Sequence, residues 1–307
     1  MKYLFSRRTL YSLFFLVLLG FIWGSGYSIA RYVRLHSIAT FSYAYWQSLG
    51  PAIFLLFYLF FTGLYRQFSI QHWFFYLLIG IFGIVIPNSV MYFVAPHLSA
   101  GILAVIVNTV SLIVYPLALF LRQERFHWIR LVCVLLGIIG ILLIIFSKLE
   151  IHWLDLNRWA LLALLTPISF ACCALYISKS SPKEISPFVL AAGMLIFSSI
   201  LLTPITFGLR QFHPLHLLSS YIDWLIILEI ILSSVGYVIL FTLLQKSGSV
   251  YYSLVGGVVA LTGLFWGHLI FHEYLNLVLV VAISLIIIAI LIMTWHQEYI
   301  RRYENRT

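Results

Sequence analysis

The chain has 307 residues, of which 63% are hydrophobic and only 9% are charged, and its formal net charge at pH 7 is +9. Because charged residues make up about a quarter of a soluble globular chain, this composition excludes a water-soluble enzyme or binding domain. The 18 Lys and Arg residues are scattered at the ends of apolar runs and form no basic face, which argues against a nucleic-acid partner.

Long stretches without Asp, Glu, Lys or Arg run through most of the chain and predict membrane-spanning helices. One helix needs roughly 20 apolar residues to cross the hydrocarbon core of a bilayer. Pro, Gly, His and charged residues divide the stretches into spans of this length. The predicted fold is an all-α integral membrane protein with ten transmembrane helices, near residues 10–30, 38–61, 72–95, 98–121, 127–147, 159–179, 187–209, 222–245, 249–271 and 275–296.

The first stretch begins behind Lys2, Arg7 and Arg8, as a signal peptide does. It is longer than the apolar core of such a peptide and has no clear cleavage site, so we expect it to be retained as the first helix. The three cysteines all lie inside apolar stretches, and a disulfide framework is not expected.

The Lys and Arg residues of the predicted loops orient the bundle. Ten spans place both ends of the chain on one side, which carries Lys2, Arg7, Arg8, Arg66, Arg122, Arg125, Arg130, Lys179, Lys183, Lys246, Arg301, Arg302 and Arg306. The opposite side carries only Arg31, Arg34, Lys148, Arg158 and Arg210. Since loops rich in Lys and Arg stay inside, we expect a multi-pass protein of the inner, cytoplasmic membrane with both termini in the cytoplasm.

Two glutamates end spans at corresponding places in the two halves of the chain. Glu124 ends the fourth predicted span and Glu273 ends the ninth, 149 residues later. The same offset carries every span of the first half onto a span of the second. Because each half has an odd number of spans, the second half enters the membrane from the opposite side, and the repeat is inverted.

Short motifs accompany these glutamates in a fixed order. They are Trp23-Gly24-Ser25 late in the first span, Ala95 followed by Ser99-Ala100-Gly101 where the third span gives way to the fourth, and Tyr115-Pro116 within the fourth. With Glu124 and Glu273, the set resembles the EamA-type transporters of the drug/metabolite transporter superfamily over about residues 10–297. The resemblance implies a central cavity near the midplane, alternating access, and export of small metabolites such as amino acids or drug-like compounds.

The resemblance also divides the chain into domains. A first EamA-like five-helix repeat is expected over 10–147 and a second over 159–296, joined by a linker at 148–158. Residues 1–9 and 297–307 are expected to form a cytoplasmic N-terminal segment and a cytoplasmic C-terminal tail.

Polar and aromatic side chains at helical spacing predict the wall of the cavity. Positions three or four apart share one face of a helix, and an unpaired amide in hydrocarbon costs several kcal/mol, so Gln47 and Asn108 should face the interior. The candidate cavity residues are Trp23, Tyr27, Tyr43, Trp46, Gln47, Asn88, Tyr92, Asn108, Ser111, Tyr115, Tyr176, Tyr237 and Ser253. Packing between helices is the alternative interpretation of these side chains.

Glu229 is the one carboxylate expected inside a span. If the eighth helix begins near residue 222, Glu229 lies roughly 10 Å below the outer surface. A carboxyl at that depth can exchange a proton, as proton-coupled transport requires, or bind a cationic group. The alternative is an interfacial carboxylate in water or paired with Arg31 or Arg210.

The remaining motif residues, Glu124, Glu273 and Pro116, are interpreted as structural. His268 and His272 have the spacing of a helical zinc pair, but they lack the intervening glutamate and an obvious third ligand. We therefore expect no metal and no cofactor.

Together these patterns predict a secondary transporter with a small-molecule substrate in a lipid bilayer, and they leave monomer and homodimer open. An intramembrane enzyme is one alternative, and it would need acid, base or metal ligands clustered at one depth. A non-transporting membrane scaffold is another, and it would show no solute-dependent behaviour.

Overall fold

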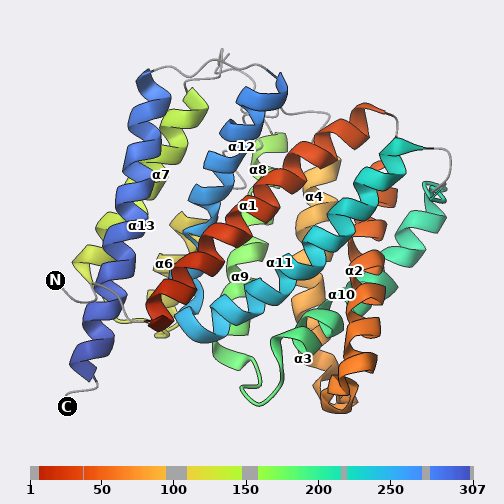
Figure 1. Cartoon of the computed structure of the whole chain (residues 1–307), viewed down its shortest axis with the longest axis horizontal. Coiled ribbons are helices and arrows are strands. Elements are labelled where there is room, and N and C mark those ends of the chain that lie inside the picture. The colour runs from red at the N-terminus through yellow and green to blue at the C-terminus, as the bar shows by residue number, and fades with distance from the viewer. Residues whose placement is uncertain are drawn as a thin grey trace.

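The computed structural model describes residues 7–36, 38–94, 109–146, 158–215, 220–271 and 277–304, which form a bundle of helices joined by short connections (Figure 1). The α-helices are α1 (Arg7–Leu35), α2 (Thr40–Thr62), α3 (Trp73–Gly80), α4 (Ile86–Val94), α6 (Val110–Phe120), α7 (Trp128–Phe146), α8 (Arg158–Ala163), α9 (Leu165–Ser180), α10 (Pro187–Gly208), α11 (Tyr221–Tyr252), α12 (Val255–Phe271) and α13 (Leu277–Glu304). Two 3-10 turns, η1 (Leu64–Gln67) and η2 (Ile70–His72), precede α3, and a π-helical turn, η3 (Ile81–Val85), joins α3 to α4.

Five helical segments of the described chain are long and apolar enough to cross a bilayer. They are Thr40–Thr62, Ile70–Met91, Leu161–Ser180, Pro187–Gly208 and Tyr221–Tyr252. Large apolar side chains also cover the outside of the bundle, where Phe61 is 81% and Phe120 is 83% exposed. So much exposed apolar surface suits lipid rather than water. The all-helical membrane class is confirmed for the described residues, and the count of ten spans stays a prediction.

The helices of the two halves correspond in order and in packing. Moved by 149 residues, α2 overlaps α10, α3 with α4 overlaps α11, α6 overlaps α12, and α7 overlaps α13. In the same way α1 overlaps α8 with α9. α2 packs against its own counterpart α10, and α7 against α13; the contact of α1 with α12 is matched by that of α9 with α6. Exchanging the two halves therefore reproduces the main helix contacts.

This arrangement separates the bundle into a centre and two edges. Figure 1 shows α7 and α13 together at one edge, α2 and α10 at the other, and α1, α9, α11 and α12 between them. The central helices come from both halves, so any space among them is bounded by both repeats.

Close packing in the centre depends on small residues of α1. A Cβ atom on Gly20 would lie 2.4 Å from Cβ of Val258, and one on Gly24 would lie 2.5 Å from Cβ of Thr262. The two glycines are four residues apart, so one face of α1 lies flush against α12. Small residues allow helices in lipid to approach in this way.

The helix of residues 73–94 is interrupted just before Pro87. Because proline has no N–H, the carbonyl one turn earlier loses its usual partner, and Ile81–Val85 form a π-helical turn there. Hydroxyl groups of α9 bind carbonyls of this region: Ser169 donates to Phe82 O at 2.8 Å, and Thr166 donates to Pro87 O at 3.4 Å. The irregular helix is thus fastened to the second half of the chain.

Candidate binding cavity

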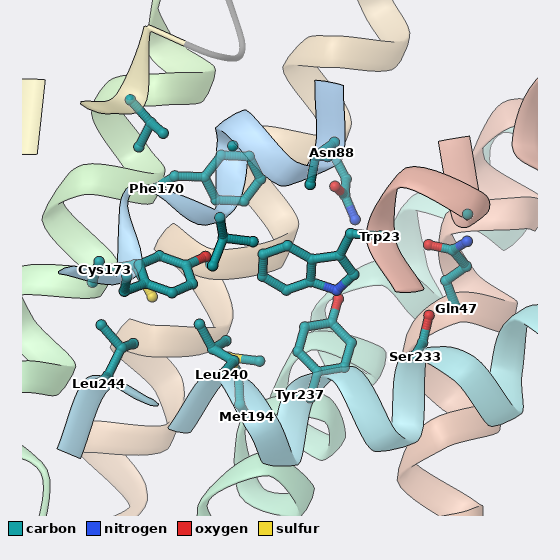
Figure 2. Close-up of a pocket in the computed structure, with 18 of the residues that line it drawn as sticks. Trp23, Gln47, Asn88, Phe170, Cys173, Met194, Ser233, Tyr237, Leu240 and Leu244 are labelled. Carbon is teal, nitrogen blue, oxygen red and sulfur yellow. The ribbon is translucent and has the colours of Figure 1, made fainter. Parts of the chain in front are cut away.

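A cavity of about 180 Å³ lies among the helices of the bundle. Its described wall residues come from α1, α2, η3, α4 and α6 in the first half and from α9, α10, α11 and α12 in the second. None of the described wall residues belongs to α7 or α13. The cavity therefore lies where the two halves meet, and Figure 2 shows many of the side chains that line it.

α11 supplies one continuous stripe of the wall. Glu229, Ser233, Tyr237, Leu240 and Leu244 are spaced four, four, three and four residues apart, so they share one helix face. Figure 2 shows the last four in this order along the helix. The stripe spans roughly 22 Å at about 1.5 Å per residue, and it changes from acidic and polar to apolar along its length.

Trp23 of α1 lies across the middle of the cavity. Its ring centroid is 6.5 Å from that of Tyr237 and 6.1 Å from that of Tyr252, both in edge-on geometry. Gly236 leaves room for the indole, since a Cβ atom there would lie 3.1 Å from Trp23 Nε1. Three rings from two helices thus form an aromatic wall.

The two sides of Trp23 differ in polarity. Figure 2 shows the polar side chains on one side of the indole, namely Gln47, Asn88 and Ser233. The side chains on the other side are Phe170, Cys173, Leu240 and Leu244. The cavity is therefore amphipathic along its length.

Glu229 stands on the polar part of this wall and is only 3% exposed. Its Oε1 accepts a hydrogen bond from Ser233 Oγ at 3.2 Å, and its Oε2 has no partner among the described residues. A Cβ atom on Gly26 would lie 2.5 Å from Oε1, so the backbone of α1 lies directly against the carboxyl group. Of the two sequence interpretations, this geometry favours an interior carboxyl over an interfacial one.

Seven of the residues predicted from the sequence stand on the described wall: Trp23, Tyr43, Gln47, Asn88, Glu229, Tyr237 and Ser253. Their role in binding a solute stays a prediction. Asn108 and Glu273 lie outside the described residues, as do the side chains of Tyr27, Tyr92 and Ser111.

Trp46 is not among the described wall residues. Its Nε1 donates to the backbone oxygen of His213 at 2.8 Å, and the backbone N–H of His213 donates to Ser42 Oγ at 3.1 Å. His213 Nε2 also lies 3.2 Å from Asp223 Oδ1. Trp46 therefore ties the connection between α10 and α11 to α2. It precedes Gln47 on α2 but points to the side of the helix face that carries Gln47, and so it does not reach the described wall.

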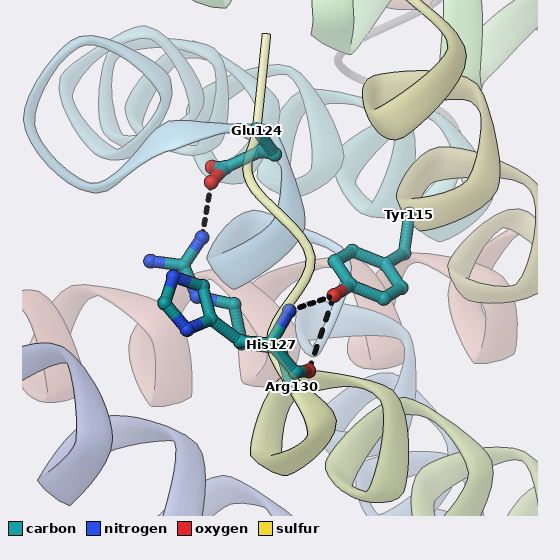
Figure 3. A network of polar contacts seen from close by, with 4 residues as sticks. All are labelled: Tyr115, Glu124, His127 and Arg130. Atoms are coloured by element: carbon teal, nitrogen blue, oxygen red, sulfur yellow. Dashed lines mark hydrogen bonds and ion pairs between the residues drawn. The ribbon is translucent and has the colours of Figure 1, made fainter. Parts of the chain in front are cut away.

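Tyr115 also lies away from the described wall. Its hydroxyl donates to the backbone oxygen of His127 at 3.2 Å and accepts from the backbone N–H of His127 at 3.0 Å. Glu124 forms an ion pair with Arg130 in the same region (Figure 3). Both contacts bridge the connection between α6 and α7, and Pro116 occupies the exposed side of α6. The contacts hold two helix ends together and leave Tyr115 no part in the described wall.

Tyr176 packs between helices as well. Its ring centroid lies 5.4 Å from that of Phe75, which joins α9 to α3. Sequence reasoning in turn missed Phe170, Met194 and Tyr252, which line the cavity. Leu240 and Leu244 were also missed. They continue the helical spacing of Glu229 and Tyr237, so that spacing could have predicted them.

Comparisons with known proteins match most of the chain to one family and to one solved fold. The model of a family described as the EamA-like transporter family matches it twice, over residues 10–146 and 157–295. A solved structure described as "Crystal structure of protein" has a TM-score of 0.71 and 13% sequence identity, and the match covers 92% of this chain and 95% of the other. At that identity the likeness shows the fold alone. No curated protein matches the sequence.

Proposed function

This chain belongs to the EamA-like transporter family and is a membrane transporter, and from that premise we propose that it exports a small metabolite across the cytoplasmic membrane by alternating access. It does so as ten transmembrane helices in two inverted five-helix repeats. Both termini lie in the cytoplasm, as the distribution of Lys and Arg predicts.

The observation that carries this proposal is a cavity whose described wall is shared between the two halves of the chain. A site at the boundary of two repeats opens to one side or the other when the repeats rock against each other. α7 and α13 pack on each other and add no residue to the described wall, so they support the moving helices from one edge.

The driving force is a gradient of ions or solutes. The sequence has no glycine-rich phosphate loop of the kind that binds ATP, because no Gly-Lys pair occurs in it. A buried carboxyl on the wall, Glu229, gives the transporter one group that can carry a proton or meet a charged solute.

Transport by the purified protein tests the proposal. We expect reconstituted vesicles to accumulate or release at least one member of a labelled library of amino acids, amines and drug-like compounds, with saturation. Ala174 lies on the wall and is 2% exposed, so Ala174→Phe should fill the cavity and reduce that transport at least tenfold.

Gly137→Phe is the matched control, because Gly137 lies on α7, away from the described wall, and a Cβ atom there would meet nothing within 4 Å. Thermal unfolding of both variants in detergent shows whether they remain folded. A library with no transported member, at either of two pH values, would contradict the proposal and favour a membrane scaffold. Equal transport by both variants, each with an unchanged unfolding temperature, would exclude the cavity as the pathway.

A further inference from the structure

We propose that the cavity selects a small amphipathic organic cation, an amine on a short chain with one aromatic ring and no carboxylate, and that Glu229 is its counter-ion. This inference rests on the proposed transport function and narrows its substrate from metabolites in general to one chemical class.

The described wall of the cavity has one acidic side chain and no basic one. Among the described wall residues Glu229 is the one acid, and none is Lys, Arg or His. The other titratable wall residues are Tyr43 from α2, Cys173 from α9, and Tyr237 and Tyr252 from α11, which are uncharged in their ordinary protonated forms. α1 presents Trp23 and Gly26 to the cavity. A ligand that complements these described residues is therefore positive.

The carboxyl group itself is short of partners. Ser233 donates the one hydrogen bond that it accepts from the described residues, and Oε2 is buried without a partner among them. A carboxylate buried in this way is costly unless a cation or a proton neutralises it. An alkylammonium group brings both a positive charge and N–H donors to Oε2.

The aromatic side chains of the wall also favour a cation that carries an aromatic ring. Cations are attracted to the faces of Trp and Tyr rings within about 6 Å, and the attraction is strongest for Trp. Trp23 stands between the polar side chains around Gln47 and Ser233 and the apolar end around Phe170 (Figure 2). A short-chain amine that pairs with Glu229 therefore places its aromatic ring beside Trp23 and Tyr237, because Leu240 lies about 16 Å farther along α11.

The cavity also limits the size of the ligand and disfavours a ligand with a negative charge in addition to its positive one. Its volume of about 180 Å³ is smaller than the roughly 300–1,000 Å³ of sites for drug-sized ligands, so one ring fits better than several. An amino acid brings a carboxylate in addition to its amine, and the described wall has no basic group to receive it. Zwitterions and anions should therefore bind worse than a simple amine of the same shape.

Three compounds with the same phenyl ring test this order of affinities, with the amine above the zwitterion and the anion. Phenethylamine carries only the amine, phenylalanine carries amine and carboxylate, and 3-phenylpropionate carries only the carboxylate. We expect calorimetry on the full-length protein in detergent to show at least tenfold tighter binding of phenethylamine than of phenylalanine, and no measurable binding of 3-phenylpropionate.

Glu229→Gln keeps the shape of the side chain and removes its charge, and it should weaken phenethylamine binding at least tenfold. Glu184→Gln is the matched control, because Glu184 is exposed in the connection between α9 and α10. This variant should bind phenethylamine as tightly as the unchanged protein does.

A pH series provides a readout that a merely structural role would not move. Once the pH falls below the value at which Glu229 takes up a proton, each further unit should weaken phenethylamine binding about tenfold, because proton and amine compete for one site. The phenethylamine affinity of Glu229→Gln should stay constant over the same range. This series on the unchanged protein remains decisive even if the Gln variant fails to fold.

The outcomes separate this inference from the proposed function. Binding of phenylalanine equal to that of phenethylamine, or affinity that does not change with pH, would overturn the inference. If another solute is transported while phenethylamine does not bind, the transport function stands and the assignment of a cation is wrong. If phenethylamine binds as expected but no compound crosses the membrane, the site is correct and the transport function fails.

Discussion

Gly248 shows how one residue sets the course of the chain beside the cavity. It has φ 80° and ψ 170°, a conformation that only glycine adopts easily, inside the long helix α11. The helix bends there, and Tyr252 and Ser253, just beyond the bend, line the cavity. A Cβ atom on Gly248 would lie 3.8 Å from Glu124 Oε1, so space is not what requires glycine.

Gly248→Ala should therefore destabilise the protein through the backbone alone, by about 1–3 kcal/mol, the usual cost of such a conformation. Thermal unfolding in detergent should show a lowered midpoint. Gly137→Ala serves as the control, because Gly137 lies in a regular part of α7 and its added methyl group meets nothing within 4 Å. An unfolding midpoint for Gly248→Ala equal to that of the control would mean that the bend is not required.

At the scale of elements, hydroxyl groups of α9 compensate for the broken pattern of the helix opposite. The π-helical turn before Pro87 disturbs the regular pairing of carbonyls, and Ser169 of α9 donates to Phe82 O at 2.8 Å. Cys173, one turn later, lies 3.7 Å from Ile79 O through its sulfur and also lines the cavity. The same face of α9 thus fastens the irregular helix and forms part of the wall.

Ser169→Ala should weaken this contact between the halves. Hydrogen bonds between helices in a membrane contribute about 0.6 kcal/mol on average and up to about 1.7 kcal/mol, and we expect the upper end because the Phe82 carbonyl lies at a π-helical turn. Ser284→Ala is the control, since Ser284 is exposed on α13 and donates to Val280 O in its own helix. Chemical denaturation in mixed micelles measures both, and an equal loss would contradict the role of Ser169.

At the scale of the molecule, the patterns that repeat along the chain were the predictable ones. Charge-free runs and the 149-residue offset can be counted directly along the sequence, and helical spacing brought Glu229 and Tyr237 onto one face of the wall. Which side chains of a helix face the cavity depends instead on contacts with neighbouring helices and connections. Trp46 and Tyr115 were expected on the wall, but backbone groups of His213 and His127 hold them elsewhere. Tyr252 was missed because its place follows from the bend at Gly248.

The proposed inversion of the repeats has a consequence for the whole molecule. Figure 1 shows the start of α1 and the end of α13 toward the same end of the bundle, as ten spans require. With the native cysteines replaced by alanine, cysteines introduced as Lys2→Cys and Arg306→Cys should react with an impermeant maleimide only after the cells are opened. Arg210→Cys, in the connection expected outside, should react in intact cells.

The labelling separates the count of spans from the orientation. Reaction of Lys2→Cys and Arg306→Cys from opposite sides would require an odd number of spans, and two halves of five helices would be excluded. Reaction of both from the outside would keep an even number of spans and reverse the orientation, which the excess of Lys and Arg opposes. Because α7 packs on α13 and α2 on α10, each pair joins corresponding helices of the two halves, and the labelling decides whether these partners cross the membrane in opposite directions.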